Sequence, residues 1–163
     1  MKKSKYWIEN LKLTPHPEGG YYKEIYRSKK SFQPKGFSGR RDYMTSIYFL
    51  LEKGEVSHFH SIKSDELWSY HAGDSLTVFV LHPDGDMKKL IIGPNLEKGE
   101  VLQAVVPEGS VFGSKSNGAY SLVGCTVSPG FDFNDFKLFK TSQLIEEFPD
   151  FTDTIKEFSK EEY

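Results

Sequence analysis

Short runs of alternating apolar and polar residues recur along the chain, and they predict a mainly β protein. The runs are rich in Val, Ile, Phe and Tyr and are separated by turns of Gly, Pro and Asp. We expect strands at 21–27, 45–51, 75–81, 88–92, 101–106 and 120–128, with two more runs inside 54–73. This number of closely spaced strands suggests a jelly roll or a small barrel.

Apolar residues at helical spacing occur near the two ends of the chain. Trp7, Ile8 and Leu11 share one face of a helix that we expect at 4–12. The tail carries two apolar stripes separated by a proline, which predict helices over about 141–160 that cover a sheet or an oligomer surface. With a barrel over about 18–140, residues 1–163 are expected to form a single domain.

Composition and charge exclude several classes of protein. The net charge is −2 and the charged residues are interspersed, so nothing indicates a nucleic-acid partner. No apolar run approaches the roughly 18 residues of a spanning helix, and no apolar segment follows the lysine-rich start. We therefore expect a cytoplasmic protein with no membrane partner. The single cysteine, Cys125, rules out an internal disulfide and a cysteine-based zinc cage, and is expected to be a small buried residue.

The stretch 54–73 holds the most informative chemistry. Two β-like runs are joined by a polar loop, and side chains in a strand alternate between faces. His58 and His60 should therefore point the same way, and so should Glu66 and Trp68 on the following run. If the two runs are neighbours in one sheet, both histidines and Glu66 converge. Two imidazoles and a carboxylate suit Fe, Mn, Ni or Zn, with positions left open for water or substrate.

Other polar residues stand at shaped or unusual positions. His16 and Glu18 lie on a turn over 13–22 that contains two prolines and a Gly-Gly pair, and such a turn can also be merely structural. Gln103 interrupts an apolar run, so it must be hydrogen-bonded or face a cavity. The basic loop 28–41 is typical of a solvated surface, although a loop of this length can also act as a lid or contact an anion.

Alternation also assigns faces within two strands. In 21–27, Tyr22 and Glu24 share one face and Arg27 lies on the other. In 45–51, Tyr48 lies on the more polar face, opposite the more apolar face of Ile47.

The stretch 54–73 resembles the first motif of the cupin superfamily, which is a Gly, then His-x-His, then a Glu, six residues and a Gly. The spacing from Glu66 to Gly73 matches that pattern. The loop between His60 and Glu66 is one residue longer than usual, and the approach from Gly54 to His58 is shorter.

The second cupin motif is only partly present. Pro107 to Gly109 stands where the family has Pro-x-Gly, but Gly99 precedes it by more than the usual distance. The expected histidine falls on Phe112 and the expected asparagine on Ser116. The resemblance makes that histidine the fourth metal ligand, so a site with three protein ligands, or with no metal at all, is implied.

The chain is similar to one particular group of single-domain cupins. The segments that carry this resemblance are PHPEGGYY (15–22), TSIYFLL (45–51), SHFH (57–60), SDELW (64–68), VPEG (106–109) and VSPGF (127–131). The group is similar in fold to the dTDP-sugar 3,5-epimerases, is often dimeric and is largely without an assigned reaction. The resemblance implies an all-β fold, the cupin double-stranded β-helix or RmlC-like jelly-roll barrel, with a short N-terminal helix and C-terminal helices.

The first functional hypothesis is a metal-dependent cupin enzyme. His58, His60 and Glu66 would hold one divalent ion, which would act as a Lewis acid or activate water or O2. The residues motivate this hypothesis through their spacing, and the loss of the fourth ligand at Phe112 weighs against tight binding.

The second hypothesis is a metal-free epimerase or isomerase that acts on a nucleotide sugar or a related small polar molecule. His58 or His60 would act as the base and Tyr48 or Tyr70 as the acid. The remaining candidate substrate-binding residues are Trp68 for stacking, Arg27, Arg40 or Arg41 for a phosphate, and Gln103, His16 and Glu18 for polar contacts.

The third hypothesis is a non-enzymatic cupin whose barrel binds a small ligand. In this hypothesis the pocket binds a ligand but catalyses no reaction. In each case the exposed strand edge and the apolar tail helices make a homodimer the default expectation.

Overall fold

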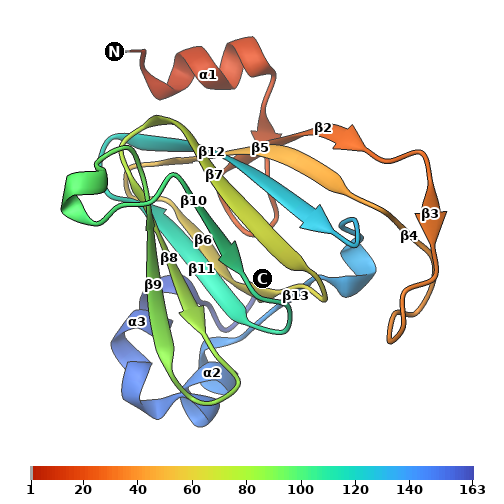
Figure 1. Ribbon diagram of the computed structural model, residues 1–163. Helices are drawn as coiled ribbons and strands as arrows, with labels where there is room; N and C mark the ends of the chain where they lie inside the picture. Colours follow the sequence, from red (N-terminus) through yellow and green to blue (C-terminus); the bar gives the residue numbers. More distant parts are fainter. Residues whose placement is uncertain (1) are drawn as a thin grey trace.

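The computed structural model describes residues 2–163 as two antiparallel sheets that face each other (Figure 1). The six-stranded sheet has the order β1 (Thr14–Pro15), β2 (Tyr21–Arg27), β5 (Thr45–Glu52), β12 (Tyr120–Ser128), β7 (Asp65–Gly73) and β10 (Gln103–Val106). The five-stranded sheet has the order β13 (Lys137–Leu138), β6 (Val56–Ser61), β11 (Val111–Ser116), β8 (Leu76–Leu81) and β9 (Met87–Ile92).

A small hairpin and several helices complete the chain. The hairpin of β3 (Ser31–Phe32) and β4 (Arg41–Asp42) projects from the body as an arm (Figure 1). The helices are α1 (Ser4–Leu11), α2 (Thr141–Glu147) and α3 (Thr152–Phe158), with 3-10 turns η1 (Leu96–Lys98), η2 (Phe133–Asp135) and η3 (Pro149–Phe151). The predicted all-β fold with short terminal helices is confirmed.

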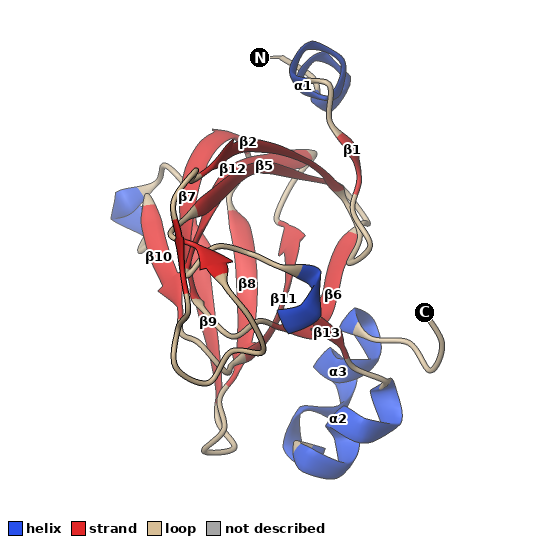
Figure 2. Cartoon of the chain, turned by 90° about the vertical axis from the view of Figure 1, so that its right-hand side faces the viewer, coloured by secondary structure: helices blue, strands red, loops and turns tan. Residues whose placement is uncertain are grey.

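The apolar side chains form one inner core and two outer clusters. The inner core lies between the sheets and includes Phe49, Trp68 and Phe112. The outer face of the five-stranded sheet packs against α2 and α3, as Figure 2 shows, with Phe59 and Phe158 at their contact. A third cluster joins α1 to the outer face of the six-stranded sheet. None of the helices in the described chain is long and apolar enough to cross a membrane.

Two β-bulges change which side chains face inward, and both adjoin the cavity described below. In β6, Ser57 pairs with Ser114 of β11 and His60 pairs with Phe112. Three residue steps along β6 therefore lie opposite only two steps along β11. In β2, the register against β5 shifts between Glu24 and Tyr26. A bulge inserts one extra residue and reverses the alternation beyond it. The expectation that His58 and His60 share a face is wrong for this reason.

The turn 16–20 closes the seam between the two sheets. The carbonyl of Glu18 accepts a hydrogen bond from the backbone N–H of His58, with an N–O distance of 2.7 Å. Gly19 has a φ of +111°, and a Cβ at this position would collide with the carbonyl oxygen of Val56. A side chain cannot be accommodated there, so the glycine permits the close approach that places Glu18 beside β6.

Candidate functional site

A cavity of about 650 Å³ opens between the two sheets. A volume of this size suits a small-molecule ligand. Its polar inner lining is made by His16, Glu18, His60 and Glu66. The apolar and aromatic wall and the mouth are formed by Tyr22, Ile47, Ile62, Cys125, Val127, Phe131 and Phe133, with Lys12, Thr14, Lys23, Glu24, Arg27, Thr45 and Asp132.

Glu18 and His60 form a buried pair inside this cavity. The Nε2 atom of His60 lies 3.1 Å from Oε2 of Glu18, and both side chains are less than a tenth exposed. The Nδ1 atom of His60 lies 2.7 Å from the carbonyl oxygen of His58, which can only accept. Nδ1 of His60 must therefore carry a proton and donate it there, which leaves the Nε2 lone pair facing Glu18. A second proton has to lie between Nε2 and Oε2.

Burial determines where that second proton resides. Desolvation raises the pKa of the Glu18 carboxyl to about 8 and lowers the pKa of His60. Both shifts favour a neutral carboxylic acid that donates to a neutral imidazole. At neutral pH the pair therefore holds one transferable proton, located on Glu18.

His58 does not line the cavity but holds both members of the pair. Its Nδ1 lies 2.8 Å from the carbonyl oxygen of Glu18, and its own carbonyl accepts from His60. Its ring packs edge-on against Tyr163, at a centroid distance of 5.5 Å. The bulge of β6 thus turns His58 away from the cavity and makes it a backbone anchor for the Glu18–His60 pair.

Glu66 and His16 complete the polar end of the cavity. Burial, and secondarily the charge of Glu18, raise the pKa of Glu66 to about 7. Burial lowers the pKa of His16 to about 3, and its Nδ1 accepts from the backbone N–H of Glu18 at 3.1 Å. His16 is therefore neutral, whereas Glu66 changes between its acid and its ionised form near neutral pH. The sequence placed His16 and Glu18 on a shaped turn, and the structure brings both into the cavity.

Arg27 lines the mouth of the cavity, but its guanidinium is already engaged. It contacts Glu24 at 2.7 Å and Asp42 at 2.9 Å, and it donates to the carbonyl of Phe131. The bulge of β2 moves Arg27 onto the cavity side together with Glu24, which corrects the expectation of opposite faces. Arg27 therefore shapes the mouth rather than presenting a free charge.

Four other candidates lie away from the cavity. Tyr48 packs in the outer cluster under α1, and the hydroxyl of Tyr70 donates to the carbonyl of Gly73 at 2.8 Å. Trp68 is 1% exposed within the inner core, so it offers no stacking surface. Gln103 is exposed and donates to Ser69 at 2.8 Å, so it is hydrogen-bonded rather than facing a cavity.

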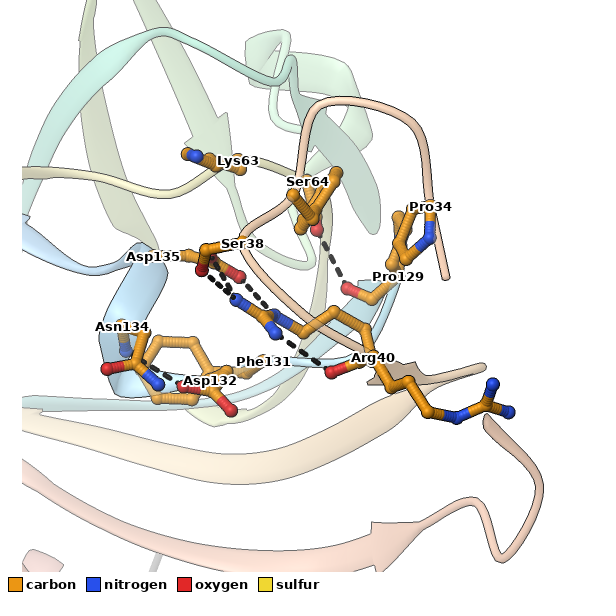
Figure 3. Close-up of polar contacts among 12 residues, drawn as sticks. Pro34, Ser38, Arg40, Lys63, Ser64, Pro129, Phe131, Asp132, Asn134 and Asp135 are labelled. Carbon is orange, nitrogen blue, oxygen red and sulfur yellow. Dashed lines mark hydrogen bonds and ion pairs between the residues drawn. The ribbon is translucent and has the colours of Figure 1, made fainter. Parts of the chain in front are cut away.

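The two arginines of the arm also serve other contacts. Arg41 is buried and makes a two-pronged ion pair with Asp135, with N–O distances of 2.7 and 2.8 Å. Dashed lines run from the carboxylate of Asp135 in Figure 3. Arg40 points away from Asp135 in Figure 3 and donates to Ser31. The arm thus contacts the turn at η2, and neither arginine lines the cavity.

The side chains do not fit the metal site that the cupin motif implies. β6 and β7 lie in different sheets, His58 is turned away, and the ring of Phe112 packs on His60 at a centroid distance of 4.2 Å. Among residues 2–163, no group of three or more His, Cys, Asp or Glu side chains is placed to hold a metal ion. His60 and Glu66 do line the same cavity.

Sequence reasoning missed the aromatic wall of the cavity. Phe131 and Phe133 lie on the turn that follows β12, and Phe136 packs beside them and beside His60. The available signal was a cluster of three phenylalanines directly after the strand-breaking pair Pro129 and Gly130.

Comparisons with known proteins agree with this architecture. The family model of the Cupin superfamily (DUF985) matches residues 5–139. The chain is 34% identical, over 151 residues, to the uncharacterized protein YML079W of Saccharomyces cerevisiae, covering 82% of this chain and 73% of the yeast protein.

Two solved structures are similar over nearly the whole chain. Protein SO0799 from Shewanella oneidensis shares 43% identity with a TM-score of 0.92, covering 99% of this chain and 100% of that one. A hypothetical protein from Leishmania major shares 40% identity with a TM-score of 0.93, covering 98% of this chain and 100% of that one. The chain belongs to the Cupin superfamily (DUF985).

Proposed function

We propose that this protein is a metal-free acid–base enzyme that isomerises or epimerises a small polar carbonyl compound. The observation that carries the proposal is the Glu18–His60 pair, 3.1 Å apart, whose geometry requires a proton between the two side chains inside a ligand-sized cavity. A neutral acid and an ionisable carboxylate in one buried site are the two groups that proton transfer next to a carbonyl needs.

The proton balance assigns a role to each carboxyl group. Ionised Glu66 takes a proton from the carbon next to the substrate carbonyl, and the C–H electron pair forms a C=C bond. The carbonyl oxygen receives the proton of Glu18. Delivery of a proton to the opposite face of that carbon, with return of the oxygen proton to Glu18, completes an epimerisation. Delivery of the proton instead to the former carbonyl carbon, with loss of the proton of the neighbouring hydroxyl, completes an isomerisation, and in both cases no proton is gained or lost overall. His60 orients the Glu18 acid through Nε2, and His58 holds both in place.

Deuterium exchange tests this proposal. The protein in D2O is incubated with a panel of nucleotide sugars that carry a keto group and of simple ketoses, and loss of the proton signal next to the carbonyl is followed by NMR. We expect exchange in at least one compound, and its reduction by at least 100-fold in His60→Gln, because the imidazole that orients the acid is removed. A panel that shows no exchange with wild-type protein contradicts the proposal.

A divalent metal, Fe, Mn, Ni or Zn, is the competing proposal that family membership supports. It requires His58 to release the Glu18 carbonyl and turn toward His60. Elemental analysis of protein purified without chelators, beside His60→Ala, separates the two proposals. One metal per chain that is lost in the variant would favour the metal enzyme.

Binding without turnover is the third outcome, and it is supported by the cavity alone.

We also propose that the protein is a homodimer, since Ile25 and Tyr26 are about half exposed on β2 beside the projecting arm. Light scattering tests the assembly, because a mass near 18.7 kDa would mean a single chain.

A further inference from the structure

Phe133 is unusual among the aromatic residues of this chain. It is 53% exposed, and no other phenylalanine or tryptophan among residues 2–163 falls in the exposed class. A single exposed apolar ring is ordinary on a protein surface. Phe133, however, lies on the lining of the cavity that contains Glu18 and His60.

The turn that carries Phe133 is fixed at several points. Asp132 caps η2 by accepting from the N–H of Asn134 at 2.8 Å, a contact drawn in Figure 3. The carboxylate of Asp135 is held by both prongs of the buried Arg41 guanidinium. A buried ion pair contributes little net stability compared with an apolar contact, but it fixes geometry.

Two backbone contacts fix the same turn on its other side. The N–H of Phe131 donates to the hydroxyl of Thr45 at 2.9 Å, and the N–H of Gly130 donates to the carbonyl of Asp42 at 2.7 Å. The backbone that carries Phe133 is therefore held in place before any ligand arrives, which lowers the entropic cost of binding against it.

The three ring neighbours of Phe133 leave about half of this side chain exposed at the cavity mouth. Phe131 meets it edge-on, at 4.9 Å and 83°, and Phe136 does so at 5.9 Å and 77°. The ring of His16 lies 6.4 Å away and is tilted by 30°, and with these three neighbours in place Phe133 is still 53% exposed. The polar inner end, with Glu18 and His60, lies deeper in the same cavity.

We propose that Phe133 is a stacking platform for a planar ring carried by the substrate, so that the ligand of this cavity combines a flat aromatic or heterocyclic group at the mouth with a polar carbonyl-bearing end inside. The inference rests on the proposed function because it names the substrate class of the same site. It also transfers the stacking function that the sequence assigned to Trp68 to a residue on the turn that follows β12.

Matched ligands test the platform without knowledge of the substrate. The four ribonucleoside 5′-monophosphates that carry adenine, guanine, cytosine or uracil are compared with ribose 5-phosphate, which lacks the ring, and dissociation constants are measured by NMR titration. We expect at least one nucleotide to bind wild-type protein tenfold or more tightly than ribose 5-phosphate. Equal binding of ribose 5-phosphate and all four nucleotides, or no binding of any nucleotide, overturns the proposal.

The variant Phe133→Leu keeps an apolar side chain but removes the plane. Loss of stacking should weaken nucleotide binding between about 5-fold and 150-fold and leave ribose 5-phosphate unchanged. Phe151→Leu, on η3 away from the cavity, is the matched control and should change neither. If Phe133→Leu changes the mass measured by light scattering and not the binding of nucleotides, the ring belongs to a contact between copies and the platform is refuted.

The variant Glu18→Gln separates this inference from the proposed function. It should retain nucleotide binding while it abolishes deuterium exchange, because the platform and the acid are different residues. Binding that requires Phe133, in a wild-type protein that never exchanges deuterium, would keep the platform and reject the enzyme. Exchange that is insensitive to Phe133→Leu in both KM and kcat would reject the platform and keep the enzyme.

Discussion

Phe59 and His60 are adjacent on β6, yet their side chains enter two different interiors. Phe59 is fully buried on the outer face, where it packs on Phe158 of α3. His60 is 3% exposed on the inner face, where it meets Glu18. The outer cluster is entirely apolar, whereas the inner end of the cavity gathers two carboxyl groups and two imidazoles.

This difference separates the stabilising part of the sheet from its chemical part. Apolar burial on the outer face stabilises the fold in proportion to the area removed from water. On the inner face, burial favours the neutral forms and moves the pKa of Glu18 to about 8, of Glu66 to about 7 and of His16 to about 3. Groups whose pKa values are shifted by burial within a cavity are typical of active sites. Substitutions on the inner face should therefore reduce activity more than stability, and substitutions on the outer face should do the reverse.

The largest effect on activity is expected for Glu18→Gln on the inner face. The amide can still donate to Nε2 of His60, so the geometry is kept while the transferable proton is lost. We expect deuterium exchange to fall by about 100- to 10,000-fold. The melting temperature at pH 8 should stay the same or rise, because a buried ionisable group is replaced by a neutral one.

The matched control for this loss of activity is Glu24→Gln at the mouth of the cavity. This residue is exposed and pairs with Arg27. It should reduce exchange far less than Glu18→Gln. Equal losses in both variants would mean that the overall charge of the cavity matters and not the proton of Glu18.

On the outer face, Phe158→Ala is expected to reduce stability and to leave activity unchanged. Phe158 is fully buried and lies 4.8 Å from Phe79 and 5.6 Å from Phe59, measured between ring centroids. The truncation should lower the free energy of unfolding by about 3 to 5 kcal/mol, measured by urea denaturation. Exchange activity below the melting temperature should be retained, and Phe158→Leu should cost much less. Loss of activity in folded Phe158→Ala would show that the two faces are coupled.

The dependence of stability on pH is a smaller effect. It is expected to arise from the titratable groups of the inner face alone. The raised pKa values of Glu18 and Glu66 mean that the folded protein holds protons which the unfolded chain has released above pH 4.5. Their contribution to stability is complete below pH 4.5 and is lost as the pH rises through 7 and 8. The lowered pKa of His16 changes the free energy of unfolding only below pH 6.5.

Above pH 6.5 the carboxyl groups therefore determine the slope. Unfolding free energies measured by urea should fall by about 1 to 2 kcal/mol per pH unit between pH 7 and 8. Glu18→Gln should flatten this slope, and Phe158→Leu should leave it unchanged. A wild-type stability that rises over this range would mean that Glu18 and Glu66 are ionised in the folded protein.

The outer face was easier to predict from the sequence than the inner one. Apolar periodicity located the tail helices and most strands, and the resemblance to cupins supplied the barrel. Strand β11 was not predicted, because Gly113, Ser114, Lys115 and Ser116 have low strand propensity and are held by pairing with β6 and β8. Pairing with the neighbouring strands, and not local sequence preference, makes this segment a strand.

The inner face escaped prediction because strict alternation does not hold at a bulge. One extra residue in β6 separates His58 from His60, and one in β2 brings Arg27 to the cavity side. Nothing in the local sequence marks either insertion. Glu18 was noticed as part of a turn, but its contact with His60 joins two segments that are distant in the sequence and meet only when the seam closes.

The smallest effect is expected for the two tyrosines that alternation offered as acids. Tyr48 lies in the outer cluster beside His71, and Tyr70 donates its hydroxyl to the carbonyl of Gly73. Neither side chain lines the cavity, so Tyr48→Phe and Tyr70→Phe should change deuterium exchange by less than about twofold. Tyr70→Phe should lower the free energy of unfolding by about 1 kcal/mol through its lost hydrogen bond. A large loss of exchange in either variant, with stability unchanged, would place the acid outside the cavity and contradict its assignment to Glu18.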